Sequence, residues 1–431
     1  HHSFHMILPR RLYENDHPDY FVRNQTPAGY YDHAPPIGDP NAARGQFPWD
    51  LTHADVLDEV IWRLEGFLRR HPEVGQFDFW PSDGRCHIRP EEYKAMTGEE
   101  MPAEGRWTEN AKFYSETGRL GDPRKTKVFH QMAKRIGEAL QQKLPDVEFV
   151  ISAYSDMPQP APDVRLPENI SATLAMYWRC YRHHTFDDAC PYNRQFKQML
   201  HDWRELYPGR LFYLSEYYMG MTANASLPYP IITTLFEEWP QLIEMGVTGA
   251  KVNTGRDVDT AAVPYNINYL AFQAIVWDDA ADRDAFLEAY CKGFFGDGWQ
   301  EMRDMHLVWE DRLQAGDCTQ PGVMHFPIYC DEQTVETSRH FVQAALEKTS
   351  GKARYRIERI EKLLAYAEEA LPVGRLARQR EHLVEAGKDT SDIDQQYLPA
   401  LERLTGRVDE LKDLDMDIIG EARPTALFAE G

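Results

Sequence analysis

Apolar runs alternate with helical segments along residues 3–252, and this alternation restricts the possible folds more than any other feature of the chain. Each run is short and is bounded by turn residues, as buried strands are. Strands that are separated by amphipathic helices predict a parallel sheet in which the helices are crossover connections. The six runs are Ser3–Leu8, Phe77–Trp80, Val147–Ala153, Ile170–Trp178, Leu211–Tyr218 and Gly246–Val252.

This pattern predicts an α/β fold of the (β/α)8 TIM-barrel type. A closed barrel has two more β/α units than the six runs supply, so we expect the chain to begin at the third strand, with the first two units absent. From residue 264 onward the pattern contains amphipathic helices alone. Because 431 residues exceed the usual size of a single core, we expect a partial barrel at residues 1–263 and an all-helical C-terminal region at residues 264–431.

Local signals predict where some helices begin and end. Thr52 is expected to be the N-cap of the helix that carries Val56, Val60 and Leu64. Pro240 is expected to interrupt the helix at residues 235–245, because proline lacks the N–H that a helix interior needs. The acidic and basic residues of the C-terminal region recur at i,i+4 spacing, so we expect them to form solvated helix faces.

The charge balance excludes some classes of partner. The chain has 47 Lys and Arg against 69 Asp and Glu, a net charge of -22. A field of this sign repels nucleic acid and anionic membrane, so a neutral or cationic ligand is expected. No segment is apolar over the roughly 18 residues of a membrane span, and none resembles a signal peptide.

The cysteines and histidines give little support for a metal. The six cysteines show no Cys-x-x-Cys pair and no spacing typical of zinc sites or of small disulfide scaffolds. Histidines near the start of the chain and the His183-His184 pair suggest a barrel metal hydrolase as an alternative. Such an enzyme usually carries an Asp on its last strand, whereas the last run here ends at Asn253. We therefore expect no metal, and the absence of phosphate-binding glycine motifs indicates no nucleotide cofactor.

Two carboxylates follow predicted strands and are flanked by aromatic residues. Asp83 comes directly after the Phe77 strand, and Glu216 closes the strand that begins at Leu211. Hydrolysis of a glycosidic bond uses two such groups, one to protonate the departing oxygen and one to stabilise the electron-poor carbon. Asp156 is a weaker third candidate. The alternative is structural, because either carboxylate could cap the following helix or pair with Arg85 or Arg179.

Several motifs, taken in order, resemble a known family. They are His2-Ser-Phe, His17-Pro-Asp-Tyr-Phe, Ser82-Asp83, Glu216-Tyr-Tyr, Leu227-Pro-Tyr-Pro and Gly246-Val-Thr-Gly. Over residues 1 to about 300 they resemble the family catalogued as domain of unknown function 4838. That family overlaps glycoside hydrolase family 163 and is distantly similar to α-glucuronidases and hexosaminidases.

The resemblance implies a (β/α)8 glycosidase, and for the characterised branch an endo-β-N-acetylglucosaminidase that acts on N-glycans. It also implies a secreted or periplasmic protein. This sequence departs from the family pattern by lacking a cysteine cluster after the fourth strand, where Cys86 alone remains. That departure bears on the substrate more than on the class of reaction.

We therefore expect a glycosidase without cofactor or metal that acts on a carbohydrate. Asp83 is predicted to be the general acid and Glu216 the nucleophile or charge stabiliser, with Asp156 in reserve. A non-catalytic carbohydrate-binding protein on the same scaffold is the alternative, while the sugar, the stereochemistry and the oligomeric state stay open. The residues predicted to contact the substrate are Trp80, Tyr154, Tyr177, Trp178, Arg179, Tyr217, Tyr218 and Asn253, with His2 and His5 at the rim.

Overall fold

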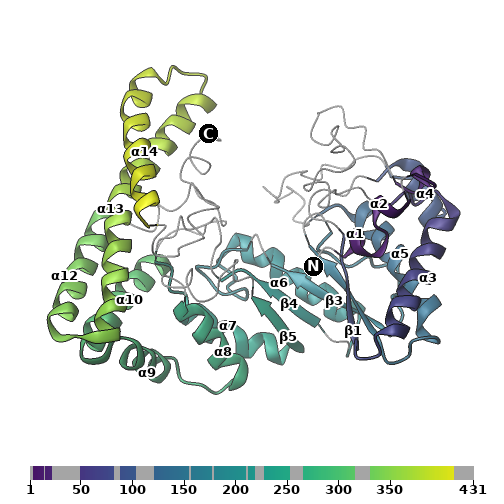
Figure 1. The fold of residues 1–431 in the computed structure, drawn as a ribbon, viewed down its shortest axis with the longest axis horizontal. Coiled ribbons are helices and arrows are strands. Elements are labelled where there is room, and N and C mark those ends of the chain that lie inside the picture. Colours follow the sequence, from purple (N-terminus) through teal and green to yellow (C-terminus); the bar gives the residue numbers. More distant parts are fainter. Residues whose placement is uncertain are drawn as a thin grey trace. The chain divides into compact units, whose positions relative to one another are not determined.

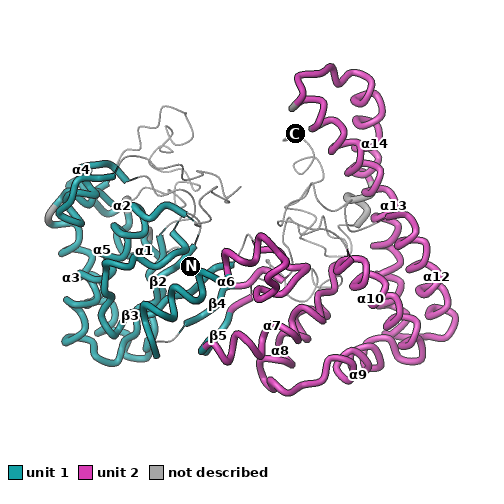
Figure 2. The backbone as a smooth tube through the Cα atoms, turned by 180° about the vertical axis from the view of Figure 1, so that it is seen from behind, with its two compact units in different colours: residues 1–176, 197–215, 246–250 teal, residues 177–196, 216–245, 251–431 magenta. Residues whose placement is uncertain are grey.

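The computed structural model describes residues 3–13, 15–21, 49–81, 88–102, 121–154, 157–176, 179–209, 212–218, 228–252, 266–315 and 331–411. These residues form a mixed α/β structure that is mostly helical and contains a five-stranded sheet (Figure 1). The chain divides into two compact units, which Figure 2 shows in different colours. Unit 1 comprises residues 1–176, 197–215 and 246–250, and unit 2 comprises residues 177–196, 216–245 and 251–431. The predicted domain boundary at residue 263 lies outside the described residues.

The strands of the sheet follow one another in the order β1-β2-β3-β4-β5, which is also their order along the chain. Pairing from β1 through β4 is parallel, with Phe77 beside Phe149 and Ala172 beside Phe212. The predicted parallel sheet is therefore confirmed, together with five of the six predicted strands. The strands are β1 (Gln76–Phe79), β2 (Glu148–Ala153), β3 (Ile170–Ala175), β4 (Phe212–Glu216) and β5 (Val247–Val252).

The helices that precede the strands are amphipathic, as their sequence periodicity predicts. In one of them, α5, the side chains of Val128 and Met132 are buried. A Cβ at Gly137 of this helix would lie 2.7 Å from side-chain atoms of Pro167 and Ile170, so glycine allows the helix to approach the start of β3 closely. The four helices are α3 (Ala54–Arg70), α5 (Pro123–Gln141), α6 (Pro191–Leu206) and α7 (Ile232–Glu244).

The first predicted strand is wrong. The run Ser3–Leu8 contains helix α1 (Phe4–Ile7) instead. Most of the run is buried as expected, although Met6 is exposed. Phe4 stacks on Trp49 with ring centroids 4.3 Å apart, and its N–H donates to Trp80 O. A short apolar run buries its side chains equally well as one helical turn or as a short strand, and periodicity cannot distinguish the two. Further short helices of unit 1 are α2 (Arg10–Tyr13), η1 (Pro18–Tyr20) and α4 (Pro90–Thr97).

The predicted N-cap of one helix and the predicted interruption of another are also wrong. The N-cap of α3 is His53, because Thr52 is held by Asp50, whose Oδ1 accepts from Thr52 N at 2.9 Å and from Thr52 Oγ1 at 2.6 Å. Helix α7 continues through Pro240. Proline removes one backbone hydrogen bond there, but buried side chains on the same face, including Trp239, keep the helix packed.

Unit 2 ends in a series of helices, as predicted for the C-terminal region (Figure 1). Aspartates cap two of them, since Asp282 accepts from Ala285 N and Asp331 accepts from Thr334 N, both at 2.8 Å. The helices are α8 (Asn266–Trp277), α9 (Arg283–Phe295), η3 (Gly296–Gly298), α10 (Trp299–Gln314), α12 (Glu332–Lys348), α13 (Gly351–Glu385) and α14 (Ser391–Leu411).

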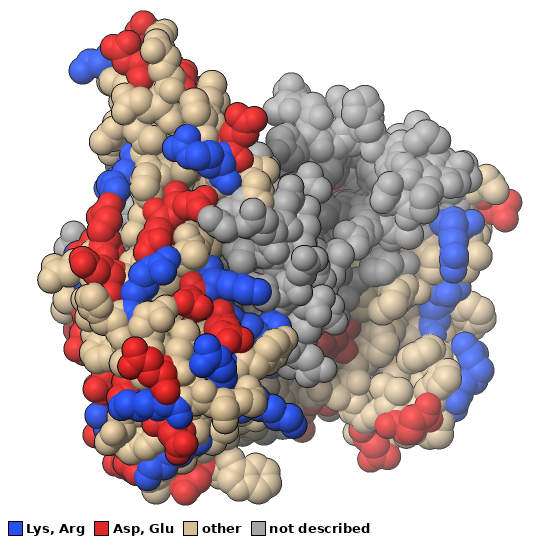
Figure 3. Space-filling model, turned by 60° about the vertical axis from the view of Figure 1, so that its left-hand side comes forward, with Lys and Arg blue, Asp and Glu red and all other residues tan. Residues whose placement is uncertain are grey.

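Charged side chains of both signs are interspersed over the C-terminal helices (Figure 3). Within α13, Arg354 pairs with Glu358 at 2.9 Å and i,i+4 spacing. Between α12 and α13, Arg339 pairs with Glu368. These side chains are exposed or partly exposed, so the predicted solvated faces are confirmed. Among the described helices, none combines the length and apolar character that crossing a bilayer requires.

Candidate functional site

Glu216 is the last residue of β4, at the carboxyl end of a parallel strand. Functional groups of α/β folds are commonly carried at this end. Leu214 and Ser215 before it are buried, and Glu216 itself is 0% exposed. An isolated charge in such a place is strongly unfavourable, so this carboxyl requires a partner or a proton.

Arg179 supplies a positive charge to two carboxyl groups. Its Nε lies 3.3 Å from Glu216 Oε2, and its Nη2 lies 2.7 Å from Glu238 Oε1. The side chains of all three residues are 0% exposed. The pairing of Glu216 with Arg179, which the sequence suggests as the structural alternative, is therefore present. We refer to Arg179, Glu216 and Glu238 as the charge cluster.

Glu238, the third member of the charge cluster, is not among the site residues predicted from the sequence. Both of its carboxylate oxygens are bonded, one to Arg179 and the other to Thr185 N at 2.6 Å. A signal exists in the sequence, because Glu238 lies three residues after Leu235 and four before Leu242, on the buried face of α7. A carboxylate in an apolar stripe is rarely buried without a partner.

Aromatic side chains surround the guanidinium of Arg179. Its Cζ lies 4.3 Å from the ring centroid of Tyr181 and 5.8 Å from that of Tyr218, distances at which a cation is attracted to the ring face. Trp239 Nε1 donates to Tyr218 Oη at 2.9 Å, and Asn268 Nδ2 donates to Tyr218 O at 3.0 Å. Tyr218 is thus held at both its side chain and its backbone.

The charge cluster has one basic group and two acidic groups, and this imbalance favours a proton. Burial raises the pKa of Glu216 to about 7, while Arg179 opposes this rise and the charge of Glu238 adds to it. Burial alone would lower the pKa of Arg179, but the two carboxyls raise that pKa well above its ordinary value. Arg179 is therefore always charged, and Glu216 can gain or lose a proton near neutral pH.

The family to which the chain belongs is clear from its first 303 residues. A family profile described as domain of unknown function, DUF4838, matches residues 1–303, which is more than half of the 431 residues. The chain is a member of the DUF4838 family. The charge cluster lies within the DUF4838 region, and the helices α12 to α14 lie outside it. No curated protein matches the chain.

Other predicted substrate-binding residues of this DUF4838 protein lie in both units. In unit 1, Trp80 stacks near Tyr154 with ring centroids 6.4 Å apart, and Trp80 is 2% exposed. In unit 2, Tyr217 and Tyr218 follow Glu216 and are buried as well. A ring needs an open face to stack on a sugar. Substrate contact by these residues therefore stays a prediction.

Several predicted site residues lie outside the described residues. These are His2, Asp83, Asp156, Tyr177, Trp178 and Asn253. His5 falls within α1. The predicted meeting of Asp83 and Glu216 in one pocket consequently stays a prediction, and so do the roles assigned to Asp156 and to the residues of the rim.

A second group of reactive side chains comes together between β3 and α6. One ligand atom from each of Cys180, His183 and Cys190 lies within 4.8 Å of the other two. Both cysteines are fully buried and His183 is partly buried. The group contains no Cys-x-x-Cys pair and is therefore not evident from the cysteine spacing alone. Cys180-x-x-His183 has the same spacing with a second residue type that also binds zinc.

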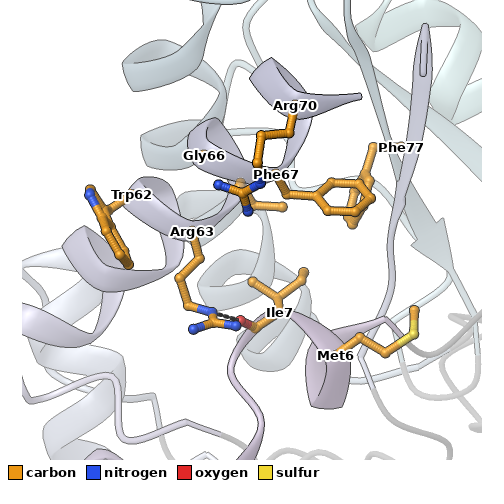
Figure 4. A pocket seen from close by; sticks show the side chains of 9 residues that line it. Met6, Ile7, Trp62, Arg63, Gly66, Phe67, Arg70 and Phe77 are labelled. Carbon is orange, nitrogen blue, oxygen red and sulfur yellow. Dashed lines mark hydrogen bonds between the residues drawn. The ribbon is translucent and has the colours of Figure 1, made fainter. Parts of the chain in front are cut away.

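Unit 1 contains a cavity of about 310 Å³ between α1 and α3 (Figure 4). Its lining includes Trp62, Arg63, Phe67, Arg70 and Phe77. Arg63 Nε donates to Ile7 O, so one of the two cations is bound to the backbone. The described residues that line this cavity include no carboxyl group. Acid–base chemistry is therefore better served by the charge cluster, and we take that cluster as the candidate active site.

Proposed function

We propose that this chain is a glycoside hydrolase in which Glu216 donates a proton to the departing sugar oxygen. The observation that carries the proposal is the complete burial of Glu216 at the carboxyl end of β4, beside an arginine that it shares with Glu238. Burial in this arrangement raises the pKa of Glu216 to about 7. Cleavage of a glycosidic bond needs a carboxyl group that is still protonated at the working pH. A pKa close to that pH also lets the same group take a proton back at the end of the reaction.

The proposal assigns the two carboxylates differently from the sequence-based prediction. An ionised nucleophile is expected to have a low pKa, whereas burial raises the pKa of Glu216. We therefore assign the acid role to Glu216, and Asp83, with Asp156 in reserve, becomes the candidate for the second carboxyl. If the substrate carries a 2-acetamido group, its carbonyl oxygen can attack the sugar carbon, and the second carboxyl then orients that group.

For the scaffold and the substrate we propose a (β/α)8 barrel and an N-glycan, with the chain acting as an endo-β-N-acetylglucosaminidase. Parallel strands that lie in chain order are what consecutive units of such a barrel would provide. The resemblance to glycoside hydrolase family 163 supports the reaction. The net charge of -22 favours a neutral oligosaccharide over an anionic polymer.

A non-catalytic carbohydrate-binding protein is the second candidate. The observation that favours it is the complete burial of the Arg179–Glu216 pair, with Arg179 bonded to Glu216 Oε2. A buried pair of this kind can also serve to specify one packed arrangement. In that case the charge cluster would organise the fold around a sugar site, and ligand would bind without turnover.

The test is turnover of a panel of aryl glycosides and intact N-glycans, with Glu310→Gln as a matched control. Glu310 is 1% exposed and bonds to Arg283 and to Thr233 N, so both variants remove a buried, arginine-paired carboxylate. Glu216→Gln should lower kcat/KM by about 100-fold to 10,000-fold, the contribution typical of an acid catalyst. Glu310→Gln should leave kcat/KM unchanged.

The leaving group gives a second, sharper readout. A dinitrophenyl leaving group departs without protonation, so Glu216→Gln should retain most of its rate on that substrate and lose rate on N-glycans. Equal losses on both substrates would contradict the role of acid. Wild-type protein that binds members of the panel and turns none of them over would favour the binding protein.

A further inference from the structure

We propose that Cys180, His183 and Cys190 form a binding site for zinc or a similarly soft divalent cation. Thiolate sulfur and imidazole nitrogen are the ligands that zinc prefers, and in a tetrahedral site they lie about 3.5 to 3.8 Å apart. His183 Nδ1 lies 3.5 Å from Cys180 Sγ, and all three ligand atoms lie within 4.8 Å of one another. Small side-chain adjustments therefore suffice to place one ion between them.

A buried asparagine fixes the backbone that carries two of the ligands. Asn193 is 0% exposed, and its Oδ1 accepts from Cys180 N at 2.9 Å. Its Nδ2 lies within hydrogen-bond distance of three carbonyl oxygens, those of Cys180 at 2.9 Å, His183 at 2.8 Å and His184 at 3.1 Å. The separation of Cys180 and His183 is thus set by the protein itself, which is what a preorganised ligand site requires.

The third ligand is presented by the start of a helix. Cys190 immediately precedes α6, and its carbonyl oxygen accepts from Arg194 N at 3.1 Å. Its own N–H donates to Asp187 O at 3.1 Å, so the turn before the helix is also fixed. The positive end of a helix favours negative charge on a nearby sulfur. That is the form of cysteine that binds metal, and each thiol releases its proton when the ion enters.

The exposure of the ligands predicts how the coordination is completed. Three protein ligands leave one position of a tetrahedral ion open. His183 is the partly exposed member of the three, whereas both cysteines are fully buried. We therefore assign the fourth position to water that reaches the ion from the side of His183.

A metal at this site would also hold in place the backbone segment that carries the charge cluster's arginine. Cys180 follows Arg179 directly, and Thr185 N in the same segment donates to Glu238 Oε2 at 2.6 Å. An ion that joins residues 180, 183 and 190 fastens the segment that carries Arg179. This role is structural, and it stands whether or not the chain is a hydrolase.

The first test measures zinc in the purified chain by mass spectrometry, after dialysis against buffered zinc. Wild-type protein should hold about one zinc per chain at this site. Cys180→Ser and Cys190→Ser should lower zinc affinity by at least about tenfold. Cys291→Ser is the matched control, because Cys291 is another buried cysteine and lies outside the group, so the zinc content of this variant should equal that of wild type.

A second test uses cobalt, whose bond to thiolate absorbs in the near ultraviolet. His183→Cys should keep cobalt and show a stronger thiolate band than wild type, a gain that misfolding cannot imitate. His183→Ala should bind cobalt at least about tenfold more weakly. Wild-type protein that takes up no zinc or cobalt would overturn the proposal. A Cys180–Cys190 disulfide in the intact protein, or zinc loss in Cys291→Ser equal to that in Cys180→Ser, would overturn it as well.

Discussion

Two buried glutamates of unit 2 each bond an arginine that also bonds a second carboxyl, and they differ in the burial of that second group: Asp284, on Arg283, is 80% exposed, whereas Glu238, on Arg179, is fully buried. Glu310 on α10 accepts from Arg283 Nη2 and from Thr233 N, both at 2.6 Å. Glu216 shares Arg179 with Glu238. Burial raises the pKa of both groups, and that of Glu216 reaches about 7. Solvent screens the charge of Asp284 but not that of Glu238, so a buried second carboxyl favours a proton on Glu216 near neutral pH.

Removing the arginine should separate the two sites most strongly. Arg179→Met leaves two buried carboxyls without a cation and should lower the free energy of unfolding by about 3 to 5 kcal/mol. Arg283→Met should cost about 1 to 2 kcal/mol, because Glu310 keeps its bond to Thr233 N and the Arg283 side chain is 29% exposed. Urea unfolding followed by tryptophan fluorescence measures both. Equal losses would show that burial of the second carboxyl has no energetic consequence.

The proton on Glu216 should make stability depend on pH. Its pKa rises from 4.5 to about 7 on folding, so between these values the folded state holds a proton that the unfolded state has released. Stability then falls as the pH rises through this window, by about 3 kcal/mol in all. Glu216→Gln lacks this loss.

Urea titrations at pH values of about 5 and about 8 measure the effect. Relative to wild type, Glu216→Gln should become more stable at the higher pH. Glu310→Gln should shift in the same direction by less, because burial raises the pKa of Glu310 as well but the other carboxyl on its arginine, Asp284, is exposed. If the free energies of unfolding of wild type and Glu216→Gln change with pH in parallel, the proposed proton on Glu216 is contradicted.

Two tyrosine hydroxyls of unit 2 should show a smaller contrast. Tyr218→Phe removes the acceptor of Trp239 Nε1, which is bonded at 2.9 Å, and should cost about 1 to 3 kcal/mol because a buried donor is left unpaired. Tyr290→Phe removes a bond of 2.6 Å to Asn266 Oδ1 that is only partly buried, so water can replace it and the cost should be about 1 kcal/mol or less. Thermal unfolding midpoints compare the two. A larger loss in Tyr290→Phe would contradict this ranking.

The smallest effect is expected at the surface. Arg339 pairs with Glu368 across α12 and α13, and their side chains are 34% and 46% exposed. Solvent screens such a pair, so Arg339→Ala should change the free energy of unfolding by about 0.5 kcal/mol or less. The measurement is the same urea titration that is used for Arg179→Met. A loss near that of Arg179→Met would mean that burial does not distinguish the pairs.

The parts of the fold that could be predicted are those with a repeated period. Helices such as α5 and α9 repeat apolar residues over several turns, and both form in the structure. The run Ser3–Leu8 is too short to show a period, and it forms a helical turn. Thr52 has a side chain that could cap a helix, but its hydroxyl donates to the carboxylate of Asp50 instead. Which hydrogen-bond partner such a side chain takes depends on its neighbours, and its residue type alone does not predict that partner.

The candidate site could be predicted in part for a similar reason. Glu216 is recognisable because it ends an apolar run, and Arg179 can be named from the sequence as a possible ion-pair partner. Glu238 lies far along the chain, and its role depends on which face of α7 is buried. Cys190 is ten residues from Cys180, and the bonds of Asn193 bring this segment together. Contacts of this kind arise from the fold and have no fixed spacing in the sequence.

The most direct test of the account is the titration of Glu216 itself. Infrared difference spectra of wild type against Glu216→Gln isolate the band of this protonated carboxyl group, and the band can be followed as the pH is raised. The account predicts that the band persists to neutral pH and disappears with a midpoint of about 7. A midpoint near the ordinary value of 4.5 would contradict it, because Glu216 would then be an ionised member of a structural pair.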